Sequence, residues 1–175
     1  APPAVSGEID LLYTGTFGSF IGYSAGFPLL ATNQFPDAGA LQYVFLGPLV
    51  GALSRAATGW ISDKFGGGRV TLATFAVMIA AMVGILVFLG IRDQPGAFWG
   101  FFAMFMVLFF ATGVGNASTF QMIPVIYRKE VPRLMPQLSA AEQTRQAEKE
   151  SAATIGFTSA IAAYGAFVIP KSYGS

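Results

Sequence analysis

Five apolar segments, each long enough to cross a lipid bilayer, dominate the sequence. They cover residues 11–32, 39–62, 70–91, 97–127 and 152–170, and short polar breaks separate them except at residues 128–151. A helix that spans a bilayer needs about 20 apolar residues, and no segment has the polar–apolar alternation of a membrane-spanning strand. The sequence therefore predicts an all-α, polytopic membrane helix bundle over residues 11–175, with a linker at residues 1–10.

The overall composition agrees with a membrane protein. Hydrophobic residues make up 54% of the chain and charged residues 11%, and the mean hydropathy is +0.59. A soluble domain usually carries about 25% charged residues. A soluble protein of buried helices is the alternative, but the apolar segments are longer than its helices need. We therefore expect a lipid bilayer to surround this chain.

The basic residues between the segments predict which side of the membrane each loop faces. If the first segment begins in the cytoplasm, the cytoplasmic loops hold seven basic residues, whereas the outer loops hold Arg92 and Lys171. An excess of Lys and Arg marks the cytoplasmic side. We expect a multi-pass protein of the inner (plasma) membrane, in which residues 128–151 form a cytoplasmic loop, either a surface helix or a solvated linker. The cytoplasmic basic residues are Lys64, Arg69, Arg128, Lys129, Arg133, Arg145 and Lys149.

Residue types that the chain lacks limit its chemistry. It contains no Cys and no His, which removes disulfides, thiol catalysis, Cys/His zinc sites and proton transfer by histidine. Its net charge is +1, so no strong field attracts nucleic acid. The sequence contains no recognisable nucleophile–base constellation. We expect no cofactor, no metal, no nucleic-acid partner and no enzymatic activity.

Arg55 is the one basic residue placed inside an apolar segment. A charged side chain at such depth costs at least a few kcal/mol, so it should face a cavity or a partner. The guanidinium group is a planar fork of N–H donors that matches a planar oxyanion, which favours an anion site. The alternative is that Arg55 extends along the helix to the cytoplasmic interface.

Aromatic and small polar residues in two other segments are further candidates. Tyr13 and Phe17 lie one helical turn apart and can wall a substrate passage, although packing is the commoner role of such rings. The stretch containing Gly113, Gly115 and Asn116 lies within an apolar run, with no strand before it, so it is not a dinucleotide loop. Its glycines would let a ligand reach the backbone, and its amides can donate hydrogen bonds.

A charged, glycine-rich loop follows the second apolar segment. Its glycines permit a tight reversal between two spans, and an acidic side chain at a helix C-terminus calls for a nearby cation. We expect this loop to act as a cytoplasmic gate, although a charged turn also has a purely structural explanation. The residues concerned are Gly59, Asp63, Lys64, Gly66 and Arg69.

Four stretches resemble the major facilitator superfamily, and three of them resemble its nitrate/nitrite porter family. Residues 59–69 resemble the superfamily loop G-x-x-x-D-[RK]-x-G-[GR]-[RK], with one extra glycine. Residues 16–27 resemble the seventh helix of the family, and residues 43–55, ending in Gly-Ala-Leu-Ser-Arg, resemble the eighth. Residues 113–121 are similar to the nitrate signature of the tenth helix, with Ala117 where the family usually has Gly.

The resemblance implies a partial C-terminal half of a major facilitator fold, namely helices seven to eleven. The N-terminal half and the twelfth helix are then expected as partners that the chain lacks. In this family one arginine from each half clamps the anion, and Arg55 matches the C-terminal one. Tyr13 and Phe17 match aromatic positions near the substrate, and the stretch from Gly113 to Asn116 matches the signature. The implied mechanism is alternating access between two helical bundles.

The implied substrate is nitrate or nitrite, and three alternatives stay open. The absence of a deep carboxylate or a histidine favours nitrate/nitrite exchange over proton-coupled nitrate symport. A carrier for another small or organic anion is the second alternative. A membrane scaffold without transport is the third, but it gives no reason to keep Arg55 in an apolar segment.

Cysteine labelling tests the predicted orientation. In a carrier otherwise free of cysteine, Lys149→Cys should react with a membrane-impermeant maleimide only from the cytoplasmic side, because the basic loops predict that residue 149 is cytoplasmic. Labelling from the outer side of intact cells would contradict the topology.

Overall fold

The computed structural model describes residues 14–164, and this part of the chain is built from helices without strands. The all-α prediction is therefore confirmed. A short π-helix, η1 (Thr14–Gly18), leads directly into α2 (Ser19–Gln34). Two 3-10 turns, Pro36–Ala38 and Ala40–Gln42, precede the next helices. These are α3 (Leu46–Ala57), α4 (Gly59–Phe65), α5 (Gly67–Gly90), α6 (Ala97–Leu134) and α7 (Ala140–Ala163).

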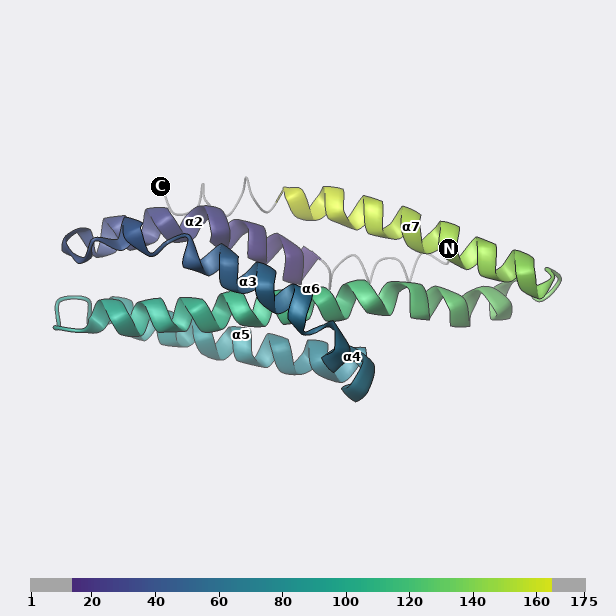
Figure 1. The fold of residues 1–175 in the computed structure, drawn as a ribbon, viewed down its shortest axis with the longest axis horizontal. Coiled ribbons are helices and arrows are strands. Elements are labelled where there is room, and N and C mark those ends of the chain that lie inside the picture. The colour runs from purple at the N-terminus through teal and green to yellow at the C-terminus, as the bar shows by residue number, and fades with distance from the viewer. Residues whose placement is uncertain (1–13, 165–175) are drawn as a thin grey trace.

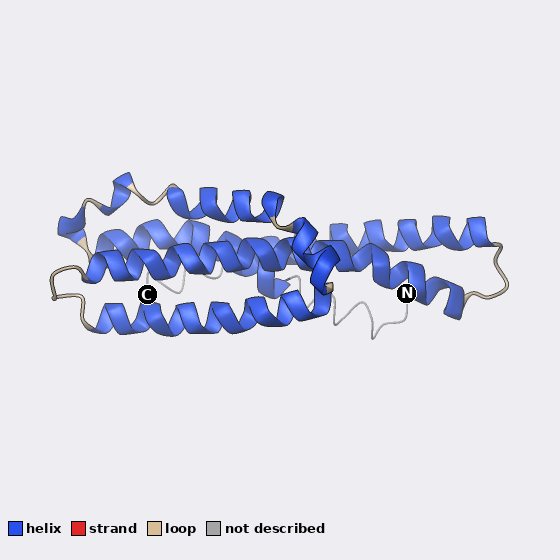
Figure 2. Cartoon of the chain, turned by 60° about the horizontal axis from the view of Figure 1, so that its bottom comes forward, coloured by secondary structure: helices blue, strands red, loops and turns tan. Residues whose placement is uncertain are grey.

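The 38-residue helix α6 is the central element of the bundle. It packs against α5, α3 and α7, and also contacts α2, α4 and η1 (Figure 1). Figure 2 shows the same arrangement from another side, with long helices running nearly parallel. Because every other α-helix of the described residues contacts α6, the side chains on α6 decide how closely its neighbours approach.

Aromatic side chains form the core between α2 and α6. Phe27 on α2 is 1% exposed, and its ring centroid lies 4.5 Å from that of Phe105 and 5.8 Å from that of Phe109. Phe20, two turns earlier on α2, meets Phe109 edge-on at 6.1 Å. Such offset and edge-to-face pairs contribute about 0.5–1.5 kcal/mol each beyond the area they bury. This ladder of rings fixes the register of α2 against α6.

The second predicted segment, residues 39–62, is not one continuous helix. Its helical part breaks at Thr58, and the two pieces are bent by 47°. Thr58 leaves the helical conformation with φ −106° and ψ 3°, and its hydroxyl donates a hydrogen bond to the Ser54 carbonyl at 2.5 Å. A side-chain hydroxyl that bonds to the carbonyl four residues earlier bends a helix. The break lies three residues after Arg55 and directly before Gly59.

Most of the predicted cytoplasmic loop, residues 128–151, is helical. Helix α6 continues through Leu134 and α7 begins at Ala140, so only a short turn joins them. Beyond α4 the two helices continue side by side (Figure 1), with Tyr127 and Ala147 buried in a small second core. Two helices thus extend into this range, and its cytoplasmic location stays a prediction.

A capping box sets the start of α7. The Ser139 hydroxyl and its backbone N–H donate hydrogen bonds to Glu142 at 2.6 and 3.0 Å, and the Glu142 N–H donates to the Ser139 hydroxyl at 3.4 Å. This reciprocal pairing satisfies N–H groups that a helix start otherwise leaves free. The Ser139 hydroxyl, and then its N–H, lower the pKa of the Glu142 carboxyl, so the cap persists down to acidic pH.

Two helices of the described part are long and apolar enough to cross a membrane, namely Gly67–Gly90 and Ala97–Leu134. A third span results if the bent pair Ala40–Ala57 and Gly59–Phe65 is counted as one. The predicted first and fifth spans extend into residues 1–13 and 165–175, outside the described range, so the number of five stays a prediction. The chain is a multi-pass membrane helix bundle.

Candidate functional site

Arg55 lies in the last turn of α3, where that helix faces α6. Its neighbour Ser54 is buried and donates hydrogen bonds to the Gly51 carbonyl on the same helix and to the Phe110 carbonyl on α6. These bonds fix the last turn of α3 against α6. The base of the Arg55 side chain is therefore held in place, while its guanidinium group is only partly buried.

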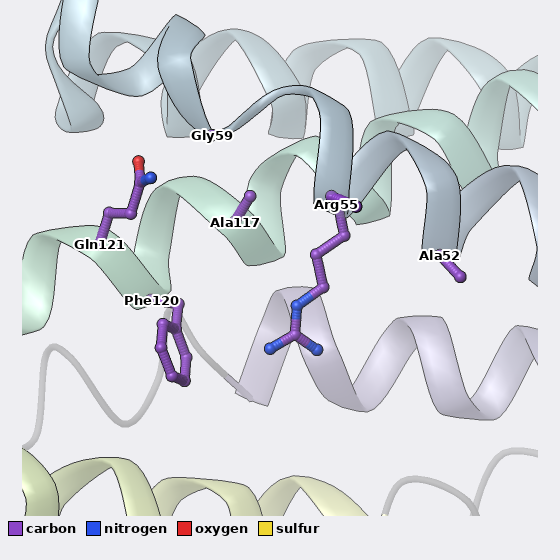
Figure 3. Close-up of a pocket in the computed structure, with 7 residues that line it drawn as sticks. Ala52, Arg55, Gly59, Ala117, Phe120 and Gln121 are labelled. Carbon is purple, nitrogen blue, oxygen red and sulfur yellow. The ribbon is translucent and has the colours of Figure 1, made fainter.

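Two aromatic rings flank the Arg55 guanidinium. Its Cζ atom lies 5.8 Å from the centroid of the Phe17 ring and 5.5 Å from that of Phe120. A cation at this distance from an aromatic face gains about 0.5–2 kcal/mol. Figure 3 shows the side chain pointing from α3 toward the η1–α2 segment, with Phe120 beside it. Within residues 14–164, no carboxylate forms an ion pair with Arg55.

The guanidinium group borders an open pocket of about 370 Å³ between α3 and α6. Small side chains leave this space free, and the polar groups at its wall come from Arg55 and Gln121. The pocket is wide enough for a small polyatomic anion with some water, because a water molecule occupies about 30 Å³ of liquid. The lining residues are Ala52, Arg55, Ala56, Gly59, Ala117, Phe120 and Gln121.

The predicted signature glycines lie at helix–helix contacts and do not line this pocket. A Cβ atom on Gly113 would collide with the Ser54 hydroxyl and the Gly51 carbonyl of α3. A Cβ atom on Gly115 would lie 2.7 Å from the Thr74 methyl group on α5. Glycine at these positions lets α3 and α5 approach α6 closely. A direct role of Gly113 and Gly115 with substrate stays a prediction.

Asn116, between those glycines, is 1% exposed. Its side-chain Oδ1 has no hydrogen-bond partner in the described part of the chain. A buried amide oxygen without a partner costs about 1–3 kcal/mol. Asn116 does not line the Arg55 pocket, and its contact with substrate stays a prediction. Tyr13, the other predicted contact, lies outside the described residues.

The predicted gate loop reverses the chain between α4 and α5. Gly66 makes this turn with φ +85°, a conformation that disfavours residues with a side chain. Asp63, Lys64 and Arg69 are exposed. The Lys64 ammonium lies 5.6 Å from the Phe65 ring centroid, and it forms no ion pair with Asp63 in the described part of the chain.

A buried serine connects this loop to α6. The Ser118 hydroxyl, which is 0% exposed, donates to the Gly67 carbonyl at 2.9 Å. It also contacts the hydroxyl groups of Ser62 at 3.3 Å and Thr71 at 3.0 Å. The end of α4 and the start of α5 are thereby fastened to the helix that carries the signature stretch.

The sequence placed Arg55 and Phe17 in one site, and the structure brings them together. It did not single out Phe120, which is the second ring beside the guanidinium. Phe120 lies four residues after Asn116, so it extends the signature face by one helical turn. That spacing is the sequence feature that could have identified Phe120 as a site residue.

Comparisons with known proteins agree with the motifs. The chain is 49% identical to "Nitrate/nitrite transporter NarU" of Salmonella typhimurium over 170 residues, 95% of this chain and 36% of that protein. It is 48% identical to NarU of Escherichia coli over 169 residues, with the same coverage. Its relatives are nitrate/nitrite transporters. No family model matches the chain.

A third relative extends the resemblance to a different genus. The chain is 39% identical to "Probable nitrate/nitrite antiporter NarK2" of Thermus thermophilus over 165 residues, 90% of this chain and 32% of that protein. The resemblance to the nitrate/nitrite porter family is thus confirmed. The chain spans about a third of the length of these relatives. The apolar helices indicate a multi-pass membrane protein.

Replacing Gly113 tests the close approach of α3 to α6. In the full-length transporter, Gly113→Ala should lower the free energy of unfolding by about 1–3 kcal/mol, because the added methyl group overlaps Ser54 and the Gly51 carbonyl. Thermal unfolding in detergent measures this. Gly156→Ala is the control, since its methyl group meets no atom within 4 Å in the described structure. Equal stability of the two variants would contradict the packing.

Proposed function

We propose that this chain supplies the C-terminal side of the anion site in a nitrate/nitrite transporter of the inner membrane, which works by alternating access. The protein acts as a carrier and not as an enzyme. One observation carries the proposal: the guanidinium group of Arg55, flanked by Phe17 and Phe120, borders a pocket among membrane helices. The relatives, whose names describe nitrate/nitrite transport, supply the identity of the anion.

The chemistry of Arg55 suits a small planar oxyanion. Nitrate and nitrite carry oxygen atoms in one plane, and two N–H groups of a guanidinium can bond to two of them at once. The rings of Phe17 and Phe120 lie beside the guanidinium and would stabilise its charge. A bound anion would then provide the counter-charge that no carboxylate provides within residues 14–164.

The rest of the site comes from chain that this sequence does not contain. The proposal requires a second basic residue from the N-terminal half, which faces Arg55 across the pocket, and packing of the twelfth helix and of lipid around the bundle. The Thermus relative is named an antiporter, and this favours exchange of nitrate for nitrite over proton-coupled symport. In an exchanger, each anion occupies the same pocket in turn.

A conservative replacement of Arg55 tests the proposal. Arg55→Lys keeps the positive charge but replaces the planar fork with a single ammonium group. If Arg55 binds the anion through paired N–H donors, nitrate uptake should fall by about tenfold or more, since 1.4 kcal/mol of lost binding already accounts for that factor. Uptake of labelled nitrate into proteoliposomes that contain nitrite, at matched protein levels, measures the effect.

Arg92→Lys is the matched control. Arg92 is exposed in the turn between α5 and α6 and donates one hydrogen bond to Gln34 at 2.7 Å. Its replacement should leave uptake near the wild-type level. Near wild-type uptake by Arg55→Lys would mean that Arg55 is an interfacial anchor, because lysine extends to the interface as well as arginine does.

A further inference from the structure

Gln121 lines two neighbouring pockets. The first is the Arg55 pocket, and the second, of about 380 Å³, lies on the side of the gate loop. Gln121 belongs to the lining of both, so it stands where one pocket gives way to the other. The second pocket is lined by Ser62, Asp63, Gly66, Gly67, Gln121, Met122, Val125, Ile126 and Lys129.

The side-chain amide of Gln121 lies against the break between α3 and α4. A Cβ atom built on Gly59 would lie 2.8 Å from Nε2 of Gln121, closer than real Cβ contacts allow. The amide group therefore occupies space that is available only because residue 59 is glycine. At the other end of the amide, Oε1 is buried and has no hydrogen-bond partner in the described part of the chain.

Arg55 and Gln121 stand at different ends of the Arg55 pocket. In Figure 3 the guanidinium group extends toward the η1–α2 segment, whereas the Gln121 amide extends toward the Gly59 segment. An anion released by Arg55 toward the gate loop therefore meets Gln121 next. The basic side chain of Lys129 lines the pocket that follows.

We propose that Gln121 forms an exit site, a second and transient binding site for the anion. This site lies between Arg55 and the pocket lined by Lys129. This inference rests on the proposed function, since it assumes that an anion occupies the Arg55 pocket. The amide donates an N–H to the anion as the anion leaves the guanidinium group. A neutral donor suits this position, because a transport pathway needs sites that bind enough to admit an ion and weakly enough to release it.

The charge and the donor at residue 121 can be changed separately. Gln121→Glu keeps the shape but places a carboxylate on the path, and Gln121→Met keeps the volume but removes the donor. Both should lower the maximal exchange rate, Gln121→Glu by about tenfold or more and more strongly than Gln121→Met, because a carboxylate repels the anion whereas methionine only fails to donate a hydrogen bond. Thermal unfolding of the purified variants in detergent reports that each is folded.

The contact between Gly59 and Gln121 allows a double-mutant test. Gly59→Ala should displace the amide and lower the exchange rate, whereas the same change in a Gln121→Ala background should add no further loss. Gly68→Ala is the control, because its methyl group meets no atom within 4 Å in the described structure. Losses that multiply in the double variant would mean that the two residues act separately and would overturn the proposal.

Parallel measurements separate this inference from the proposed function. If Arg55→Lys loses nitrate binding while Gln121→Glu exchanges at the wild-type rate, only the proposed exit site at Gln121 is overturned. If Arg55→Lys binds nitrate as tightly as the wild type, the anion site itself is misplaced, and the inference falls with it. Loss of rate in Gln121→Glu and Gln121→Met, together with loss of binding in Arg55→Lys, supports both.

Discussion

The candidate site depends on one guanidinium group held among membrane helices without a carboxylate partner in the described chain. A charge in that setting is costly unless aromatic faces, water or a counter-ion stabilise it. Phe17 and Phe120 supply the aromatic faces, and the small residues around the pocket leave room for the counter-ion. In the proposed function, a bound anion would offset the cost of keeping Arg55 there.

Helix α6 holds the elements around the Arg55 pocket in place. Its glycine at residue 113 admits α3, which carries Arg55, and its hydroxyl at Ser118 fastens the turn between α4 and α5. The Arg55 pocket and the predicted gate loop thus both pack against α6, and Gln121 of α6 lies between them. In contrast, α3 and α4 are separated by a 47° bend, so the segment that bears the gate is not a rigid continuation of the segment that bears Arg55.

The features that follow from composition and periodicity could be predicted from the sequence, whereas those that depend on three-dimensional packing could not. Apolar length predicted the membrane helices, and the isolated charge of Arg55 predicted a cavity. The bend at Thr58 was missed because a hydroxyl bonded to a backbone carbonyl leaves the hydropathy pattern unchanged. The capping box that begins with Ser139 was readable as Ser-x-x-Glu, but the surrounding charges were interpreted as a loop. The ring of Phe120 became a site residue only through the packing of α6 on α3.

The most direct measurement is the distance between bound anion and Arg55 in the intact carrier. Solid-state NMR of membranes that contain [15N]nitrate and arginine labelled with 13C at Cζ reports proximity through dipolar recoupling. Paired N–H donors place the two nuclei within about 5 Å, so we predict strong dephasing that disappears in Arg55→Lys. Dephasing of the same strength in that variant, or none in the wild type while nitrate remains bound, would contradict the assignment of Arg55 as the anion ligand.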